Sequence, residues 1–193
     1  ANITTGETAT IYKTSKSKQS KQTNKRPTIA VLATGGCIDT IAAIKVGFKP
    51  IWATEICNTR KQMWEDLTDT KCHGDTFTIN YSKLKSPDFL SSGQPCPDYS
   101  RSGSQTGEYG ETGWMFTAQT EIINTLQPKA IRLEISDNTI NVHGGREVNQ
   151  VIEQLQNKYV ITKAIIPVWR YGDCTTRNRL FIVGFNRDLE GPA

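Results

Sequence analysis

Short apolar runs alternate with amphipathic stretches along the chain from residue 28 onward. The apolar runs predict six strands, at residues 28–32, 50–53, 89–90, 130–133, 160–168 and 180–185. Helical spacing of apolar residues predicts four helices between them, one ending near residue 45, one through residues 64 and 67, and two over 114–126 and 148–155. Segment 77–81 is expected to be irregular. This alternation predicts an α/β fold with a parallel sheet covered by helices on both faces.

The first 27 residues break this pattern, because they are polar and basic. One acid, Glu7, stands against six cations, which are Lys13, Lys16, Lys18, Lys21, Lys25 and Arg26. Such a segment buries too little apolar surface to order itself. We expect residues 1–27 to be a basic tail or linker, with a nucleic-acid-contacting arm as the alternative. We expect residues 28–188 to form one domain, followed by a short end at 189–193.

Composition agrees with a single globular domain. The chain has 193 residues, of which 36% are hydrophobic and 22% charged, and its net charge is +4. It contains no apolar run long enough to predict a membrane-spanning helix, so we expect no membrane partner. A secretory signal pattern is not found at its start. The small positive charge is a weak indication of a polyanionic partner.

Cysteine usage indicates the redox setting. The five cysteines are odd in number and form no CxxC pairs; they are Cys37, Cys57, Cys72, Cys96 and Cys174. We therefore expect a reducing, intracellular location, in the cytoplasm or nucleus, and no structural zinc site. Cys72-His73 has no second pair at zinc spacing, so its expected role is structural. No metal ligands are predicted.

Polar and glycine residues follow several predicted strands. Gly35-Gly36 follows the first strand, Glu55 the second, and Gly74-Asp75 comes next. In open α/β sheets these strand ends gather at one edge, where a glycine turn and a carboxylate can hold a nucleotide. The glycines lack the GxGxxG spacing, and GxxxxGK[ST] is absent. A dinucleotide site of that kind and a P-loop ATPase are therefore not favoured.

The segment 91–100, Ser-Ser-Gly-Gln-Pro-Cys-Pro-Asp-Tyr-Ser, carries the most specific chemistry. It places Cys96 on a proline-flanked turn directly after the apolar pair Phe89-Leu90. A cysteine at the carboxyl end of a strand, on a turn that cannot be helical, is a candidate nucleophile. The alternative is a small packed hydrophobic residue.

Over about residues 29–187 the chain resembles the cytosine-C5 DNA methyltransferase family. The nucleophile motif is matched by Asp88 to Gly103, and the block of arginines by Tyr171-Gly172 with Arg177 to Gly184. The remaining blocks occur in the family's order: Leu32 to Gly36, Gly47 to Glu55, Gly74-Asp75, and Glu134 at the start of the Glu-Asn-Val motif. The resemblance implies a Rossmann-like, S-adenosylmethionine-dependent fold, mostly parallel with an antiparallel closing strand. It also implies DNA methylation, as in restriction-modification.

The resemblance implies roles for these residues. Cys96 would add to C6 of a flipped cytosine, Glu134 would contact its N3 and amine, and Arg177 and Arg179 would hold the base. The implied cofactor set is Leu32, Gly35, Gly36, Glu55, Ile56, Asp75 and Pro95, with Glu55 on the ribose and Asp75 on the adenine amine. Segment 100–112 resembles the catalytic loop, where Ser100, Arg101 and Tyr109 would contact nucleic acid. Solvated loop acids, surface ion pairs and a plain solvent loop are the alternatives.

The chain also departs from the family pattern. In the first cofactor block Ala33, Cys37 and Ile38 stand where an aromatic residue and glycines are usual, which predicts weak cofactor binding. Ile135-Ser136 follows Glu134, and Cys174-Thr175 precedes the arginines. The family continues into a target-recognition domain, so we expect this chain to need such a segment or a partner subunit. A tRNA substrate and an inactive Rossmann-like subunit remain alternatives.

Overall fold

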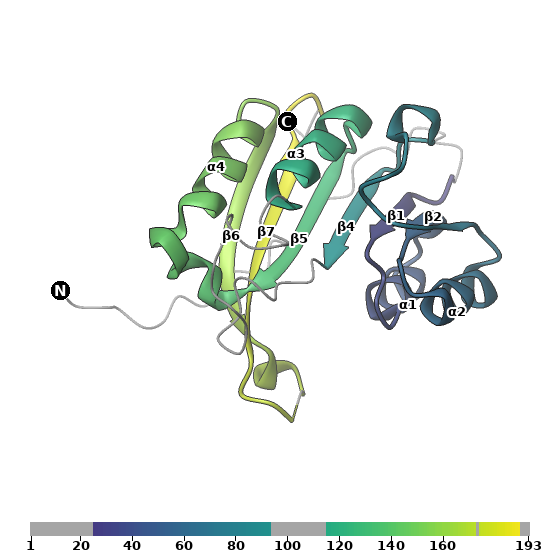
Figure 1. Ribbon diagram of the computed structural model, residues 1–193, viewed down its shortest axis with the longest axis horizontal. Helices are drawn as coiled ribbons and strands as arrows, with labels where there is room; N and C mark the ends of the chain where they lie inside the picture. The colour runs from purple at the N-terminus through teal and green to yellow at the C-terminus, as the bar shows by residue number, and fades with distance from the viewer. Residues whose placement is uncertain (1–24, 94–114, 173, 190–193) are drawn as a thin grey trace, which may run out of the picture.

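A computed structural model describes residues 25–93, 115–172 and 174–189. Their strands form one seven-stranded sheet in the order β3-β2-β1-β4-β5-β7-β6 (Figure 1). The strands are β1 (Thr28–Leu32), β2 (Lys49–Thr54), β3 (Cys72–His73), β4 (Phe89–Gly93), β5 (Ala130–Ser136), β6 (Tyr159–Pro167) and β7 (Asn178–Asn186). Strands β1 to β5 pair in parallel, whereas β7 is antiparallel to both β5 and β6. This confirms the predicted mostly parallel sheet with an antiparallel closing strand.

Two details differ from the sequence prediction. Cys72–His73 forms a two-residue edge strand, β3, which was not predicted because so short a run has no periodicity. Strand β5 continues to Ser136, past the predicted end at residue 133, so Glu134 lies inside the strand. The prediction failed there because polar residues on one face interrupt the apolar run while the other face stays buried.

Helices cover both faces of the sheet, as predicted. They are α1 (Ile38–Lys45), α2 (Asn58–Thr68), α3 (Met115–Leu126) and α4 (Arg146–Leu155), with short 3-10 turns η1 (Tyr81–Lys83), η3 (Asp137–Ile140), η4 (Val142–Gly145) and η5 (Val168–Tyr171). Helices α3 and α4 lie over β5, β7 and β6, whereas α1 and α2 lie beside β1 and β2 (Figure 1). None of the helices in the described residues is long and apolar enough to cross a membrane.

Strand β1 shows why both faces are covered. All five of its residues are buried, and successive side chains point to opposite faces. Ala30 and Leu32 belong to the larger core cluster, with residues of α3 and α4. Ile29 and Val31 belong to a second cluster, with residues of α1 and α2. The carboxyl end of β1 therefore emerges between two packed layers.

Asp88 connects β1, β4 and β5 at their amino ends. Its Oδ2 accepts hydrogen bonds from the backbone N and Oγ1 of Thr28, at 2.8 and 2.7 Å. Its Oδ1 lies 2.8 Å from Nζ of Lys129, and its backbone oxygen accepts from Ala130. Partial burial opposes the charged form, but the hydrogen bonds from Lys129 and Thr28 hold the pKa of Asp88 at about 2.

We expect Asp88→Asn to lower the free energy of unfolding at pH 7 by about 1–2 kcal/mol. The loss is no larger because Lys129 is exposed to solvent, which weakens its ion pair with Asp88. The pKa of Asp88 is lower in the folded state than the value of about 3.9 in the unfolded chain, so its charge stabilises the folded state above about pH 4. This stabilisation is lost as the pH falls towards 2. The stabilities of the two proteins should therefore converge between pH 4 and 2. Urea unfolding followed by circular dichroism measures this, with Asp66→Asn as control. If the two free energies of unfolding differed by the same amount at every pH in that range, the stabilising role of the Asp88 charge would be wrong.

Candidate functional site

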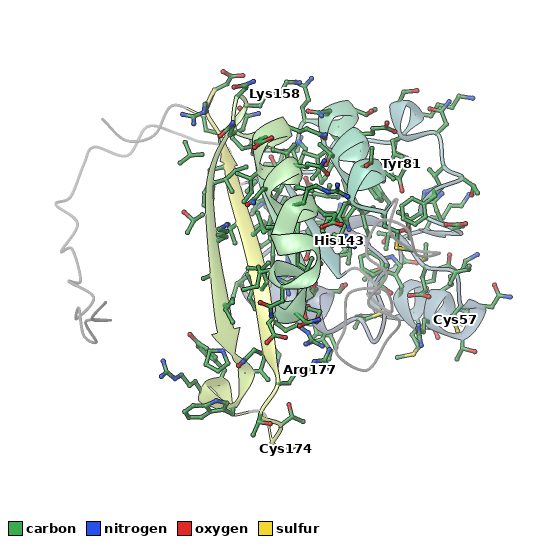
Figure 2. All side chains as sticks on the ribbon, turned by 60° about the vertical axis from the view of Figure 1, so that its left-hand side comes forward. Cys57, Tyr81, His143, Lys158, Cys174 and Arg177 are labelled. Carbon is green, nitrogen blue, oxygen red and sulfur yellow. The ribbon has the colours of Figure 1, made fainter. Side chains whose placement is uncertain are left out.

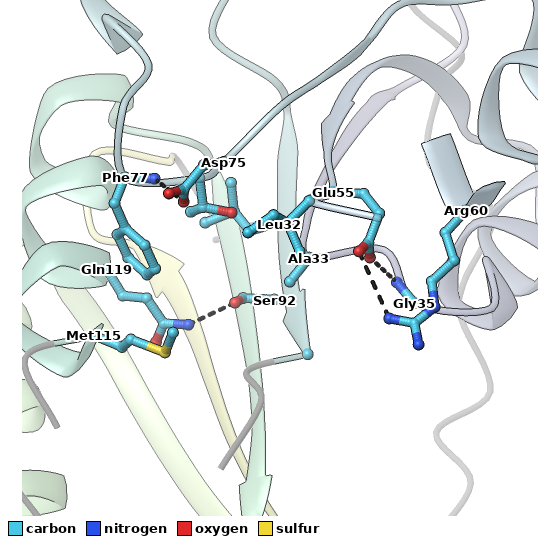
Figure 3. Close-up of a pocket in the computed structure, with 13 residues that line it drawn as sticks. Leu32, Ala33, Gly35, Glu55, Arg60, Asp75, Phe77, Ser92, Met115 and Gln119 are labelled. Carbon is cyan, nitrogen blue, oxygen red and sulfur yellow. Dashed lines mark hydrogen bonds and ion pairs between the residues drawn. The ribbon is translucent and has the colours of Figure 1, made fainter. Parts of the chain in front are cut away.

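A pocket of about 380 Å³ opens at the carboxyl ends of β1, β2 and β4 (Figure 3). Its wall combines carboxylates, residues of the turn after β1, and one apolar and one amide side chain of α3. The residues that line it are Leu32, Ala33, Gly35, Glu55, Ile56, Arg60, Asp75, Thr76, Phe77, Ser92, Gly93, Met115 and Gln119. Five of the seven residues predicted for a cofactor are therefore among them: Leu32, Gly35, Glu55, Ile56 and Asp75. Gly36 lies in the same turn but not in the wall.

Glu55 is the most firmly held carboxylate of the pocket. Its side chain is only 4% exposed. Oε2 accepts a hydrogen bond from the backbone N–H of Gly35 at 3.0 Å, and Oε1 accepts from the backbone N–H of Cys57 at 3.0 Å. Arg60 lies 3.6 Å from Oε1 (Figure 3). Glu55 thus joins the turn after β1 to the start of α2, which confirms that the predicted glycine turn and acid meet.

The turn after β1 holds two residues other than glycine in a left-handed backbone. Ala33, Gly35 and Cys37 all have positive φ, of 53°, 53° and 59°. A left-handed backbone costs a residue with a Cβ about 1–2 kcal/mol, so Ala33 and Cys37 hold this turn at some expense. The departure from the family pattern therefore changes the side chains and keeps a tight turn.

Asp75 and its neighbours form the opposite wall. Oδ1 of Asp75 accepts the backbone N–H of Phe77 at 3.0 Å, and Oδ2 has no hydrogen-bond partner among the described residues. Phe77 places an aromatic ring at the pocket (Figure 3). Sequence reasoning missed Phe77, which stands two residues after the predicted acid. It also missed Met115 and Gln119, whose four-residue spacing places them on one helix face.

Gln119 brings a buried amide to the same pocket. The residue is 3% exposed, and its Nε2 donates to Oγ of Ser92 at 2.6 Å. Its Oε1 has no partner among the described residues. An unsatisfied buried acceptor costs about 1–3 kcal/mol, so this oxygen favours a ligand or water that donates a hydrogen bond.

A second polar cluster lies on the sheet beside the pocket. Oε1 of Glu134 lies 3.2 Å from Nε of Arg179, and its Oε2 lies 3.2 Å from Nη2 of Arg132. In the parallel register Glu134 is opposite Gly93, the last described residue before the Cys96 segment. The structure therefore brings Glu134 and Arg179 together next to the predicted nucleophile segment.

Arg177 lies outside this cluster. It precedes β7, its side chain is exposed, and its backbone oxygen accepts from Val168 at 3.0 Å. Figure 2 shows it at the end of the sheet, near the loop of Cys174. Arg132 instead supplies the second guanidinium group. Its two-residue spacing from Glu134 was the available signal, because alternate strand residues share a face.

A family model described as C-5 cytosine-specific DNA methylase matches residues 32–192. The chain belongs to this family. Similar curated proteins include the type II methyltransferases M.NgoBI of Neisseria gonorrhoeae, 29% identical over 77% of this chain and 49% of the relative, and M.HpaII of Haemophilus parainfluenzae, 29% identical over 76% and 42%. The methylase chain thus spans about half the length of these relatives, or less.

Solved structures show the same fold. A DNA modification methyltransferase encoded within an E. coli prophage superposes with a TM-score of 0.69 and 18% identity, covering 86% of this chain and 49% of the other. The S. pombe Dnmt2 methyltransferase superposes with a TM-score of 0.61 and 12% sequence identity, and the match covers 87% of this chain and 53% of the other. The methylase sheet and its helices therefore have the arrangement found in known methyltransferases.

Five predicted residues lie outside the described part of the methylase chain. They are Pro95, Cys96, Ser100, Arg101 and Tyr109. Their roles stay predictions from the motif and the family. The described residues around them, Gly93 on β4 and Met115 at the start of α3, both line the pocket. The last described residue before the nucleophile segment and the first one after it therefore both lie in the pocket wall.

Two cysteines near the pocket have thiol pKa values that are shifted in opposite directions. Cys57 precedes α2, and the backbone N–H groups of Arg60 and Thr59 hold the pKa of its thiol below the usual range. Burial raises the pKa of the Cys72 thiol to about 12, helped by the charge of Glu65. The Cys72 thiol therefore stays protonated at neutral pH.

We expect iodoacetamide at pH 8 to alkylate Cys57 at least about tenfold faster than Cys72, because the thiolate is the reactive form. Peptide mass spectrometry over time measures both rates in one sample. In urea the two rates should become similar, which controls for peptide detection. Equal rates in the folded protein would contradict the difference in thiol pKa.

Proposed function

We propose that this chain is the catalytic part of a DNA (cytosine-5-)-methyltransferase that uses S-adenosylmethionine. The observation that carries the proposal is Glu134, paired with Arg179 and opposite Gly93, beside a pocket that holds two carboxylates. A carboxylate and guanidinium pair beside such a pocket suits acid–base activation of a base and stabilisation of developing charge. Family membership supports the same conclusion.

The pocket residues fit the proposed cofactor. Glu55 presents carboxylate oxygens that can accept from ribose hydroxyls, and Oδ2 of Asp75 can accept from an adenine amine. The unpaired Oε1 of Gln119 offers a further buried acceptor for a ligand N–H. When bound, S-adenosylmethionine would supply an electrophilic methyl group on its sulfonium.

The residues of the chain would activate the base. The Cys96 thiolate adds to C6 of the cytosine, forming an S–C6 bond, and the electron pair of the C5=C6 bond makes C5 nucleophilic. Glu134 shares a proton with N3 and accepts a hydrogen bond from the exocyclic amine, and Arg179 offsets developing charge. After C5 gains the methyl group, water accepts the C5 proton, the C5–H electron pair restores the C5=C6 bond, and the S–C6 bond breaks to release the thiolate. The base would have to be flipped out of the duplex.

The proposal extends to partners and location. The described residues include no separate domain that could read a DNA sequence, so a target-recognition segment or partner subunit is part of the proposal. A restriction-modification role follows from the names of the relatives, which are type II methyltransferases. An intracellular location suits a DNA substrate and unpaired thiols.

Asp75→Asn should weaken binding of S-adenosylhomocysteine to the chain about tenfold to a hundredfold. The asparagine keeps an oxygen for the Phe77 N–H but replaces the free acceptor by a donor. Isothermal titration calorimetry measures the affinity, with the exposed Asp66→Asn as matched control. Unchanged affinity would remove Asp75 from the cofactor site.

Methyl transfer to DNA tests the proposed function as a whole. The chain is fused to the part of the Neisseria gonorrhoeae relative that it does not span, and incubated with tritiated S-adenosylmethionine. We expect label at cytosine C5 in duplex DNA carrying the relative's target, and none in tRNA. Label only in tRNA would establish the RNA alternative, and label in neither would favour an inactive subunit.

A further inference from the structure

We propose that Arg132 is a positioning residue that orients Glu134 and is itself held by Asp39 of α1. The inference rests on the proposed function, because it assigns how the candidate catalytic carboxylate is aimed. It concerns Arg132 and Asp39, which no motif of the sequence singled out, and Ser91, which lies in the nucleophile motif but was given no role of its own.

Glu134 alone is poorly defined in orientation. The terminal torsion of a glutamate is broad, so one contact leaves its carboxylate free to rotate. Arg179 holds Oε1, through Nε at 3.2 Å. Arg132 holds Oε2, through Nη2 at 3.2 Å. Two guanidinium groups on different strands, β5 and β7, fix both oxygens and hence the plane that would face the base.

Arg132 is suited to this because its guanidinium group is itself fixed. Nη1 pairs with Oδ2 of Asp39 and donates to Oγ of Ser91 at 2.7 Å. The guanidinium carbon lies 5.0 Å from the ring centre of Phe181. With Glu134, these contacts come from α1, β4, β5 and β7. A side chain already held by three partners on three elements loses little further entropy when it positions a fourth group, Glu134.

Asp39 gives this arrangement its connection to the pocket. It stands in the first turn of α1, four residues after Gly35, whose N–H contacts Glu55. Ser91 donates to the same Oδ2 at 2.8 Å, which closes a triangle with Arg132. The packing of α1 therefore fixes Asp39, which sets the position of Arg132. Arg132 in turn sets the position of Glu134.

The first test uses the chain by itself and needs no activity. Solvent exchange of the Arg179 Nε–H, observed by ¹⁵N NMR, reports how firmly Glu134 accepts that hydrogen bond. We expect Arg132→Met to speed this exchange at least about tenfold, and Arg132→Lys to restore part of the protection. Arg187→Met, at the far end of β7, is the matched control. Unchanged exchange in Arg132→Met would overturn the proposal.

The second test uses the fusion in single turnover. Arg132→Met should slow methyl transfer about 10- to 100-fold, the penalty for a misplaced group, with KM for DNA and cofactor nearly unchanged. Asp39→Asn should slow it about threefold to tenfold, but have no further effect in Arg132→Met, because the two act through one path. Additive effects would contradict a shared path. If the unsubstituted fusion transfers no methyl group, the proposed function fails, while the exchange measurement still decides the role of Arg132.

Discussion

Cys96→Ser is expected to abolish methyl transfer by the fusion, with a loss of more than about 10⁴-fold, because the covalent route to a nucleophilic C5 disappears. A serine hydroxyl is far less nucleophilic than a thiolate, although it is similar in size. The cofactor affinity should remain within about twofold, since the pocket is built by other residues. Single-turnover transfer of tritiated methyl groups measures the rate, and calorimetry the affinity.

The matched control for this substitution is Cys174→Ser. Cys174 is an exposed free thiol in the loop before β7, remote from the pocket. It should retain full activity. If Cys96→Ser and Cys174→Ser were equally active, the covalent route would be wrong whatever the family resemblance implies.

Glu134→Gln should slow methyl transfer by about 10²- to 10⁴-fold, the usual contribution of a positioned acid–base group. Glutamine keeps the shape and can still accept from one arginine, but it cannot share a proton with N3 of the base. It also leaves one guanidinium group without its carboxylate partner. Rates are measured in single turnover, with the unfolding midpoint of each variant recorded alongside.

The control for Glu134→Gln is Glu121→Gln, on the exposed side of α3. That variant should match the unsubstituted protein in rate and stability. A Glu134→Gln protein that is folded and transfers methyl groups at the normal rate would reduce Glu134 to a structural partner of the two arginines.

Much of the fold could be predicted because its signals are local. Residues 29–32 form a continuous apolar run, and the strand is buried on both faces. The helices before Lys45 and Leu126 show clear apolar spacing and were placed correctly. What could not be predicted depends on distant pairing. The insertion of β7 between β5 and β6 is set by packing, since no local pattern states which strands are neighbours.

In the candidate site, too, residues with a local sequence signal were predicted and residues that depend on distant partners were not. Glu55 and Asp75 were predicted because each follows a recognisable strand or motif, and both line the pocket. Gln119 and Arg132 were not, because their importance arises from the face on which they lie and from partners far along the chain. Arg132 and Asp39 are 93 positions apart and become neighbours only when β5 and α1 pack. Long-range ion pairs of this kind leave no signature in a single sequence.

Trapping of the covalent adduct tests the central claim most directly. A duplex that carries 5-fluorocytosine at the target has no C5 proton to lose, so the S–C6 bond cannot be released after methyl transfer. Denaturing mass spectrometry of the fusion with this duplex and S-adenosylmethionine should show one species with the mass of protein, DNA strand and methyl group. It should be absent from Cys96→Ser. A protein that methylates or binds this DNA without any Cys96-dependent adduct would contradict the proposed chemistry.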